Sequence, residues 1–540
     1  MIPTSARGDG GGERSGNGGR PEPGSIHASP ASRRERLETA LIIAAALLAA
    51  LAMPPGGGQA AEQSAAAASP AAETAELRTA GCDELEWVID SALSRAPLRG
   101  AEVALVVESL ESGDVLCERN ADLPMVPASN MKLVTAAAAL SELGPDYRFL
   151  TTVTTDAPEI GSTLAGNLYV RGTGDPSFVT EELYKLAESI RVRGVDRIQG
   201  DIVLDASWFD SLAATSDLVA GGDRAYHART GALSLNFNGL AVHVTPGDSH
   251  GEPAVVRLAP ETSFVDVRNL ASTRRRGART ALTVHRANEN GRNVVTVEGS
   301  IAVGSGPHVA YRNIDDVPGY FGSSLVRFLA EAGVVVDGSV RSGRAPDEGL
   351  LVAEHRSKPL SLIIRDLNKY SNNFVAEQLL KALSASAFGP PGTTSGGIRV
   401  LEDFLVSAGA DSTSWSISDG SGFSRANRLS PRALARVIRA ALSDFRYKYE
   451  FAASLSVSGV DGTLEDRMGY PALRGLVRAK TGLLDGVTAI SGIIEQEDGE
   501  ELVVSLLVNG YGCEAWRVHD FEHSVLALLR SGLVSERGGR

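Results

Sequence analysis

Residues 127–132 of this chain read Pro127-Ala128-Ser129-Asn130-Met131-Lys132, and an alanine-rich apolar run follows them to Leu140. A helix places residues three apart on one face, so the spacing predicts that Ser129 and Lys132 are neighbours. Pro127 prevents the helix from extending backwards, which leaves Ser129 near a helix N-terminus, where unpaired N–H groups and the dipole favour negative charge. A serine there, with an amine one turn away, has the base and the oxyanion-stabilising environment that an acyl-transfer nucleophile needs.

Two further motifs strengthen this interpretation, because a lone S-x-x-K is usually a helix-capping serine followed by a solvated lysine. An S-x-N triplet stands at Ser371-Asn372-Asn373, and a K-T-G triplet stands at Lys480-Thr481-Gly482. Either triplet alone is typical of a helix cap or a turn. The three motifs in this order match the signature of class A β-lactamases and penicillin-binding proteins.

The polar side chains of the first two motifs can supply the nucleophile, the base and the proton donor that an acyl-enzyme hydrolase needs. Ser129 is expected to be the nucleophile and Lys132 its base, which requires a lysine pKa well below the free value of about 10.4. Burial and a second ammonium nearby, which Lys480 could supply, both lower a lysine pKa. Ser371 can relay a proton to the leaving nitrogen, and Asn373 can hold a substrate carbonyl or orient Lys132.

The third motif is expected to hold the substrate. Lys480 and Thr481 can bind an anionic substrate terminus, and Gly482 lets the strand backbone approach the substrate closely. The backbone N–H groups of Ser129 and Leu483 are expected to form the oxyanion hole. The sequence has no C-x-x-C motif and its histidines are scattered, so it predicts neither a metal site nor a cofactor.

Length and composition are typical of a multidomain enzyme. A chain of 540 residues is long enough for two or more domains, and 43% hydrophobic residues can build a sizeable core. The net charge of −14 argues against nucleic acid as a partner. Three cysteines, Cys82, Cys117 and Cys513, allow one disulfide, and the sequence does not say which pair forms it.

The N-terminal segment predicts export. Residues 1–36, rich in Gly, Arg, Ser and Pro, are expected to be disordered. An apolar run behind several arginines predicts a signal peptide at residues 37–61, and an uncleaved anchor is the alternative. Residues 62–81 predict a linker. We therefore expect a protein of the periplasm or extracytoplasmic cell envelope, with peripheral or signal-anchor membrane association if the segment is retained.

The rest of the chain predicts an α/β (α+β) domain in two segments, residues 82–150 and 345–540. A mostly β insertion, residues 151–344, separates them. The insertion is predicted from short strand patterns between turn signals, among them residues 166–170 and 232–237. After Lys480, alternating apolar residues predict two strands and then an amphipathic helix, at residues 488–495, 501–509 and 514–529.

On these motifs the chain resembles the class C low-molecular-mass penicillin-binding proteins, the D-alanyl-D-alanine carboxypeptidase/endopeptidase family, over roughly residues 83–535. The long insertion between the first two motifs is a hallmark of that family. Further matching stretches are Gly172-Thr173-Gly174-Asp175-Pro176, Ala376-Glu377, Asp419-Gly420-Ser421-Gly422 with Ser424-Arg425, and Gly459-Val460-Asp461-Gly462-Thr463-Leu464.

The resemblance implies a penicillin-recognising serine transpeptidase-like (β-lactamase-like) domain split by the insertion. It implies removal of the terminal D-alanine from peptidoglycan stem peptides, with cleavage of peptide cross-links, and it implies acylation of Ser129 by β-lactams. It also implies that an acidic residue of the insertion and an arginine near the third motif bind the diaminopimelate side chain. We assign these roles to Asp223 and Arg425.

One residue departs from the family pattern. Thr or Ser usually follows K-T-G directly, and here the residue is Leu483. The backbone N–H survives this change, but a hydroxyl that would help to hold the terminal carboxylate is lost. The departure predicts that endopeptidase use is favoured relative to carboxypeptidase use.

Two alternatives remain open at this stage. A β-lactamase or esterase could use the same residues, although the sequence has no E-x-x-L-N segment for a deacylating glutamate and the insertion is too long for class A. A non-catalytic peptidoglycan-binding scaffold is the other alternative, and the presence of every expected catalytic side chain argues against it.

Overall fold

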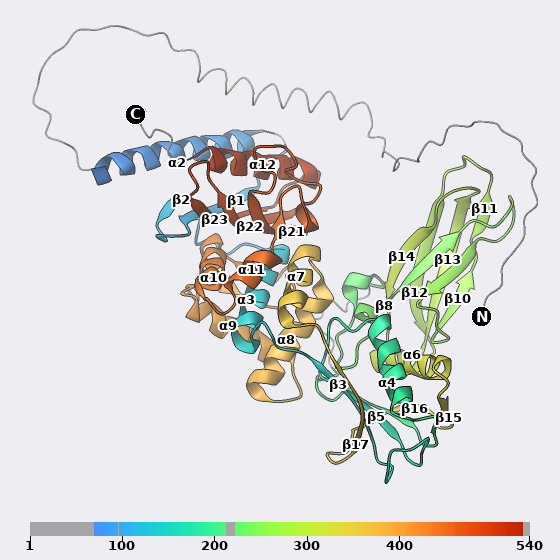
Figure 1. The fold of residues 1–540 in the computed structure, drawn as a ribbon. Coiled ribbons are helices and arrows are strands. Elements are labelled where there is room, and N and C mark those ends of the chain that lie inside the picture. The colour runs from blue at the N-terminus through green and yellow to red at the C-terminus, as the bar shows by residue number, and fades with distance from the viewer. Residues whose placement is uncertain (1–69, 96, 212–221, 533–540) are drawn as a thin grey trace, which may run out of the picture. The chain divides into compact units, whose positions relative to one another are not determined.

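The computed structural model describes residues 70–95, 97–211 and 222–532 (Figure 1). The expected disordered extension and signal peptide, residues 1–61, lie outside the described residues. Helix α2 (Pro70–Ser94) occupies residues 70–81, where a linker was expected, and its alanine, glutamate and leucine content favours a helix. Within the described ranges, no helix combines the length and the apolar character that a membrane crossing requires.

The first and last parts of the folded chain share an antiparallel six-stranded sheet in the order β2-β1-β23-β22-β21-β20. Side chains of its strand β1 alternate between two cores, with Val103 and Leu105 on one face and Ala104 and Val106 on the other. The two strands predicted after Lys480 are confirmed as β22 and β23. The strands are β1 (Glu102–Ser109), β2 (Val115–Arg119), β20 (Ser456–Val457), β21 (Val477–Leu484), β22 (Val487–Glu495) and β23 (Glu501–Asn509).

Helices cover both faces of this sheet (Figure 1). Helices α2 and α12 (Ala515–Ser531) pack on one face, and a layer of helices built around α3 (Met131–Leu143) packs on the other. The first ten residues of α3 are buried, and its run of alanines lets neighbouring helices approach closely. The neighbours are α7 (Leu360–Tyr370), α8 (Asn373–Phe388), α9 (Thr394–Ser407), α10 (Pro431–Ser443) and α11 (Lys448–Ser454), with a short ribbon of β18 (Trp415–Ser416) and β19 (Arg428–Leu429).

Residues 150–356, which we call the inserted segment, form sheets of their own around a second hydrophobic core. One sheet has the order β16-β7-β5-β3-β17, and its strand β17 pairs with β3, so the chain leaves the inserted segment after Arg356 rather than at 344. The other sheets have the orders β15-β6-β4, β14-β8-β9 and β10-β13-β11, with β12 paired to β13.

The elements of the inserted segment are mostly short strands, as predicted. They are β3 (Leu150–Thr155), β4 (Thr163–Leu164), β5 (Leu168–Gly172), α4 (Thr180–Val192), β6 (Arg197–Ile198), β7 (Ile202–Asp205), β8 (Gly239–Thr245), β9 (Val255–Ala259), β10 (Val265–Asn269), β11 (Ser272–Arg274), β12 (Ala281–Glu289), β13 (Arg292–Ala302), β14 (His308–Asn313), α6 (Val317–Glu331), β15 (Val335–Val336), β16 (Val340–Ser342) and β17 (Leu350–Arg356).

The predicted strand at residues 232–237 is wrong. Asn236, Phe237 and Asn238 have φ angles of 50°, 57° and 52°, which is left-handed backbone and cannot continue a strand. Asparagine tolerates this conformation because its amide can bond to nearby backbone. The strand begins only at Gly239.

Helix α8 joins the inserted segment to the rest of the fold. The buried side chain of Gln378 donates to the carbonyl oxygen of Gly231 at 2.9 Å and accepts from the Gly231 N–H at 3.0 Å. One turn later, buried Lys381 forms an ion pair of 2.6 Å with Asp210. The same helix begins at Asn373, so these contacts fix the inserted segment relative to the S-x-N motif.

Candidate active site

Ser129 lies in a single 3-10 turn, Ala128–Asn130, that leads directly into α3. Ala128 has a φ of 46°, a strained angle for a residue with a side chain, and such strain is concentrated at functional sites. The Nζ atom of Lys132 lies 2.9 Å from the Oγ atom of Ser129, which confirms the predicted proximity. Lys132 is fully buried.

Two further contacts orient the Lys132 amine. Its Nζ atom lies 2.8 Å from Oδ1 of Asn373 and 2.6 Å from the carbonyl oxygen of Ser421. Both oxygens can only accept hydrogen bonds. A neutral amine has two N–H bonds and one lone pair, so these acceptors take both protons and the lone pair faces Ser129. The geometry therefore directs the lone pair of a neutral Lys132 at the Ser129 hydroxyl.

The electrostatic surroundings favour that neutral form. Burial lowers the pKa of Lys132 from 10.5 to about 8, against the opposing effect of the carboxylates of Asp419 and Glu377. Burial, and then the charge of Lys132, lowers the pKa of Lys480 well below its ordinary value. Two buried ammonium groups so close together disfavour double protonation, as expected from the sequence.

The S-x-N and K-T-G motifs meet through Lys480. Its Nζ atom donates to Oγ of Ser371 at 2.9 Å and to the carbonyl oxygen of Thr481 at 2.7 Å. Ser371 stands between α7 and α8 with a left-handed φ of 56°, and Asn372 caps α8 by accepting from the Val375 N–H. The helix junction thus aims Ser371 at Lys480 and Asn373 at Lys132.

Strand β21 brings the K-T-G backbone against the nucleophile turn. A Cβ atom on Gly482 would lie 2.8 Å from the carbonyl oxygen of Pro127, so the close approach requires glycine. Thr481 donates from its hydroxyl to Oγ1 of Thr463 at 2.8 Å. Leu483, two residues further along the same face of the strand, is 55% exposed.

A buried turn at residues 419–422 supports Lys132, and the sequence analysis assigned no role to it. The Oε1 atom of Glu377 accepts from the N–H groups of Gly420 and Ser421 at 3.1 and 2.9 Å, and Asp419 accepts from Gly422 at 2.6 Å. These bonds aim the Ser421 carbonyl at Lys132. The contact uses a backbone atom, so no side chain at position 421 signals it. Glu377, one helical turn after Asn373, could have been noticed by that spacing.

Asp223 and Arg425 bind to different partners in the structure. Asp223 forms an ion pair of 3.0 Å with Arg312, inside the inserted segment, and Arg425 donates to the carbonyl oxygen of Asp485. Across the described ranges, no ion pair joins the two residues. The rings of Tyr226 and Phe423, 5.9 Å apart, do bring the neighbourhoods of Asp223 and Arg425 together.

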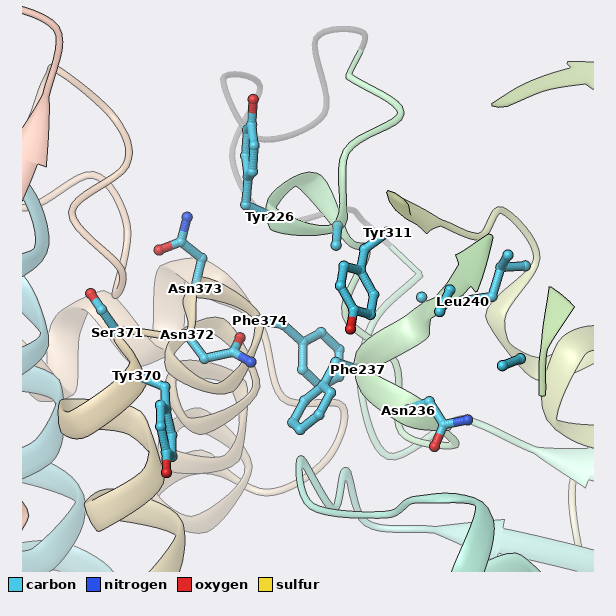
Figure 2. Close-up of a pocket in the computed structure, with 14 residues that line it drawn as sticks. Tyr226, Asn236, Phe237, Leu240, Tyr311, Tyr370, Ser371, Asn372, Asn373 and Phe374 are labelled. Atoms are coloured by element: carbon cyan, nitrogen blue, oxygen red, sulfur yellow. The ribbon is translucent and has the colours of Figure 1, made fainter. Parts of the chain in front are cut away.

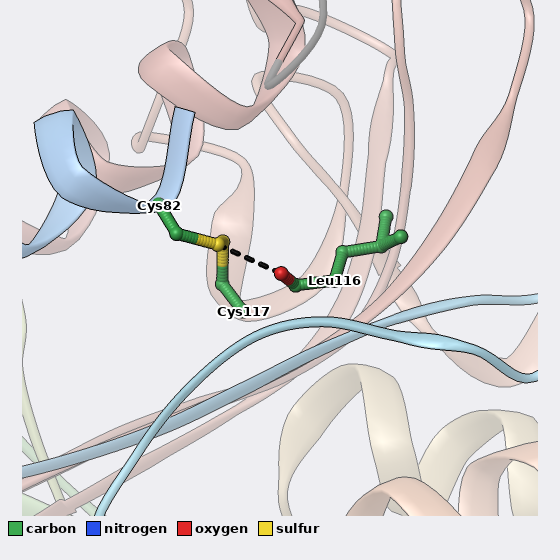
Figure 3. Close-up of a disulfide and its surroundings, with 3 residues drawn as sticks. All are labelled: Cys82, Leu116 and Cys117. Carbon is green, nitrogen blue, oxygen red and sulfur yellow. Dashed lines mark hydrogen bonds between the residues drawn. A yellow bond between two sulfur atoms is a disulfide. The ribbon is translucent and has the colours of Figure 1, made fainter. Parts of the chain in front are cut away.

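Metal-binding side chains do not gather anywhere in the described part of the chain: no group of three or more His, Cys, Asp or Glu residues could hold an ion there. A disulfide joins Cys82 of α2 to Cys117 of β2, and Cys513 is free (Figure 3). The structure thus decides the pairing that the sequence left open.

Comparisons with known proteins agree with this geometry. A family model described as the D-Ala-D-Ala carboxypeptidase 3 (S13) family matches residues 85–529. The D-alanyl-D-alanine carboxypeptidase of Actinomadura sp. (strain R39) is 34% identical over 458 residues, which cover 82% of this chain and 84% of the relative.

Solved structures show the same fold. The crystal structure of penicillin binding protein 4 (dacB) from Haemophilus influenzae matches with a TM-score of 0.72 and 23% identity, covering 82% of this chain and 99% of that chain. Its complex with a β-lactam matches with a TM-score of 0.68 and 25% identity, covering the same shares of the two chains. The predicted fold class, a penicillin-recognising α/β domain split by a long, mostly β insertion, is confirmed.

Proposed function

This chain belongs to the D-Ala-D-Ala carboxypeptidase 3 (S13) family and is a serine-type D-Ala-D-Ala carboxypeptidase, and from this membership we propose that it cleaves peptidoglycan stem peptides through an acyl-enzyme on Ser129. The observation that carries the proposal is the set of three contacts of Lys132, which leaves its lone pair facing Ser129. The proposed substrate residues are the terminal D-alanines of the stem.

Acylation begins with proton transfer. Neutral Lys132 takes the proton of the Ser129 hydroxyl while the oxygen attacks the carbonyl carbon of the penultimate D-alanine. The N–H groups of Ser129 and Leu483 hold the negative oxygen that forms. The C–N bond then breaks, and the leaving nitrogen takes a proton from Ser371, whose hydroxyl is bonded to Lys480. The proton that Lys132 took from Ser129 then replaces it on Ser371, which leaves Lys132 neutral again. Water later attacks the ester, releases the shortened stem and restores Ser129.

Lys480 and Thr481 are the proposed anchor of the terminal carboxylate. Burial disfavours the charge on Lys480 in the empty site, and an arriving carboxylate would restore it by pairing. Asn373 is the proposed partner of both Lys132 and the substrate backbone. Asp223 and Arg425 stay candidates for the stem's side chain. The Leu483 side chain adds no hydroxyl, so cross-link cleavage is proposed alongside carboxypeptidase activity.

The proposed location is the periplasm or extracytoplasmic cell envelope, where peptidoglycan lies. The Cys82–Cys117 disulfide supports this location, because such bonds persist in oxidising compartments. The apolar run before residue 62 supports export, with signal-anchor retention as the membrane-associated variant of the proposal. β-Lactams are the proposed inhibitors, acylating Ser129 in place of the stem.

Covalent labelling tests the proposal. The protein and its Ser129→Ala variant are incubated with a fluorescent penicillin, denatured and examined by electrophoresis, and D-alanine release from a pentapeptide is measured in parallel. We expect label and release in the parent and neither in the variant. Labelling followed by fast loss of the label would favour a β-lactamase. A folded parent that takes no label would favour a non-catalytic scaffold.

A further inference from the structure

A cavity of about 490 Å³ lies beside the S-x-N motif, between that loop and the inserted segment (Figure 2). Ser371 and Asn373 form part of its wall, so it is continuous with the site described above. Aromatic side chains dominate the rest of the lining: Tyr226, Phe237, Tyr311, Tyr370 and Phe374. Among the residues that the structure describes, no Asp, Glu, Lys, Arg or His lines it.

Phe237 is held in this cavity at a conformational cost. It is the central residue of the left-handed turn Asn236–Asn238, a conformation that strains a bulky residue. Nevertheless Phe237 remains 41% exposed. The partial burial of Phe237 contributes too little stability to account for its strained backbone, whereas a role in binding a ligand would account for it.

Two asparagine amides lock the turn. Asn236 accepts from the Thr180 N–H at 2.9 Å and donates to the Thr180 hydroxyl at 2.8 Å. Asn238, fully buried, donates to the carbonyl oxygen of Arg229 at 2.7 Å and accepts from the Leu235 N–H at 3.1 Å. The strained turn is therefore built into the inserted segment and is present before any ligand arrives.

Phe237 meets a second ring across the cavity. Its centroid lies 6.1 Å from that of Phe374, edge to face, and Figure 2 shows Tyr311 above the pair. Asn372 and Asn373 also belong to the lining. Exposed rings with a few amide groups suit a ligand that has apolar C–H faces and neutral hydrogen-bonding groups.

Peptidoglycan has one part of that kind. Its stem peptides carry carboxylates and amines, which are costly to place against rings without a charged partner. Its glycan consists of N-acetylated sugars, whose ring faces are apolar and whose hydroxyl and acetamido groups are neutral. Four stem residues span up to about 14 Å, enough for the glycan to reach a cavity that shares a wall with the catalytic groups.

We propose that this cavity binds an N-acetylated sugar of the glycan strand whose stem is being cleaved. The inference rests on the proposed function. It assigns to the inserted segment a role in recognising the glycan, with Phe237 and Tyr311 as the stacking residues.

The test compares two substrates that differ only in the sugar. One is a free stem pentapeptide, and the other is the same peptide attached to the N-acetylglucosamine–N-acetylmuramic acid disaccharide. Phe237→Asn removes the ring and keeps a residue that tolerates the left-handed turn. Tyr311→Ala removes a second ring. Phe445→Ala is the matched control, because it removes a phenylalanine ring that is 77% exposed and does not line the cavity.

We expect the parent to prefer the disaccharide substrate about tenfold in kcat/KM, through KM. We expect Phe237→Asn and Tyr311→Ala to lose that preference, and Phe445→Ala to keep it. Equal use of the two substrates by the parent overturns the inference. An equal loss on both substrates in the two cavity variants also overturns it, because it indicates only structural support for the S-x-N loop.

A binding measurement separates this inference from the catalytic proposal. The neutral disaccharide N,N′-diacetylchitobiose is titrated into the parent and into Ser129→Ala, with calorimetry or ligand-observed NMR as the readout. Binding to both, but not to Phe237→Asn, supports the sugar site even if the enzyme cleaves neither peptide. Absence of binding to the parent overturns it even if peptide cleavage is observed.

Discussion

The carbonyl oxygen of Ser421 lies 2.6 Å from the Nζ atom of Lys132, and this contact fixes the direction of the Lys132 lone pair. Together with Asn373 it occupies both protons of the neutral amine. The proposed base for Ser129 is therefore oriented from a turn nearly three hundred residues away in the sequence. Each group that holds this turn should then influence acylation without touching the substrate.

The rate of acylation by penicillin should depend on pH through Lys132. Only the neutral amine accepts the Ser129 proton, and its pKa is lowered to about 8. The second-order rate constant should therefore rise about tenfold per pH unit below pH 8 and level off above it. Stopped-flow acylation between pH 6 and 10 measures this profile. A rate that stays flat across that range would contradict the assignment of Lys132 as base.

Replacing Glu377 should show whether its hydrogen bonds to the turn at residues 419–422 or its negative charge matters more for acylation. In Glu377→Ala the buried N–H of Gly420 loses its acceptor, which costs about 1–3 kcal/mol, whereas the N–H of Ser421 keeps a second bond, to Oδ1 of Asp419. Urea denaturation should show that loss of stability, and acylation should slow at every pH.

The Glu377→Gln variant serves as the control for that experiment. It keeps one acceptor oxygen and should therefore recover most of the stability and rate. Ionised Glu377 raises the pKa of Lys132, but burial raises the pKa of Glu377 itself to about 8, so the carboxyl group is mostly neutral below pH 8 and the acid limb of the Glu377→Gln rate profile should move to lower pH only slightly. A glutamine variant as impaired as the alanine variant would show that the charge matters more than the hydrogen bonds.

The nucleophile motif was predictable because its two residues are close in sequence. Ser129 and Lys132 are three apart, and helical geometry alone makes them neighbours. Their meeting with Ser371, Asn373 and Lys480 depends on contacts across the whole fold, and only the family resemblance placed these residues together. The Ser421 carbonyl escaped prediction because a backbone acceptor leaves no side-chain signature.

The inserted segment shows a second reason why a sequence pattern can fail to predict the structure. Its short strands were predicted from alternation and turn residues, but residues 232–237 alternate in the same way and do not form a strand. The amides of Asn236 and Asn238 outweigh the alternating pattern by bonding to distant backbone and hydroxyl groups. Such bonds depend on tertiary neighbours, which local pattern does not report.

Removing the disulfide should lower stability more than activity. Cys82 and Cys117 are 35 residues apart, and closing a loop of that length stabilises a fold by about 3–4 kcal/mol. The double variant Cys82→Ser/Cys117→Ser should lose about that much free energy of unfolding in urea. Its acylation rate at 25 °C should stay near that of the parent, because the bridge joins α2 to β2 on the far face of the sheet. Cys513→Ser is the control and should change neither quantity.

Substituting Gly422 should disable the site through its backbone. Gly422 has a φ of 78°, and a Cβ atom there would overlap the carbonyl oxygen of Ala128, next to the nucleophile. Gly422→Ala should therefore shift the turn that carries the Ser421 carbonyl and reduce penicillin labelling by at least about tenfold. The matched control is Gly409→Ala, which is also left-handed, at a φ of 80°, but has open space around its Cβ position. Equal labelling of the two variants would contradict the proposed role of the turn.

Restoring a hydroxyl after the K-T-G motif should improve carboxypeptidase activity. Leu483 lies two residues beyond Thr481 on the same face of β21, and its side chain is largely exposed at the mouth of the site. In Leu483→Thr the new hydroxyl can donate to the terminal carboxylate, and a hydrogen bond to a charged group contributes about 1.5–3 kcal/mol. We expect kcat/KM for D-alanine release from a pentapeptide to rise about tenfold or more. Leu483→Val is the control, because valine has the β-branched shape of threonine and adds no hydroxyl. If the threonine and valine variants release D-alanine at the same rate as the parent, the missing hydroxyl does not limit the enzyme.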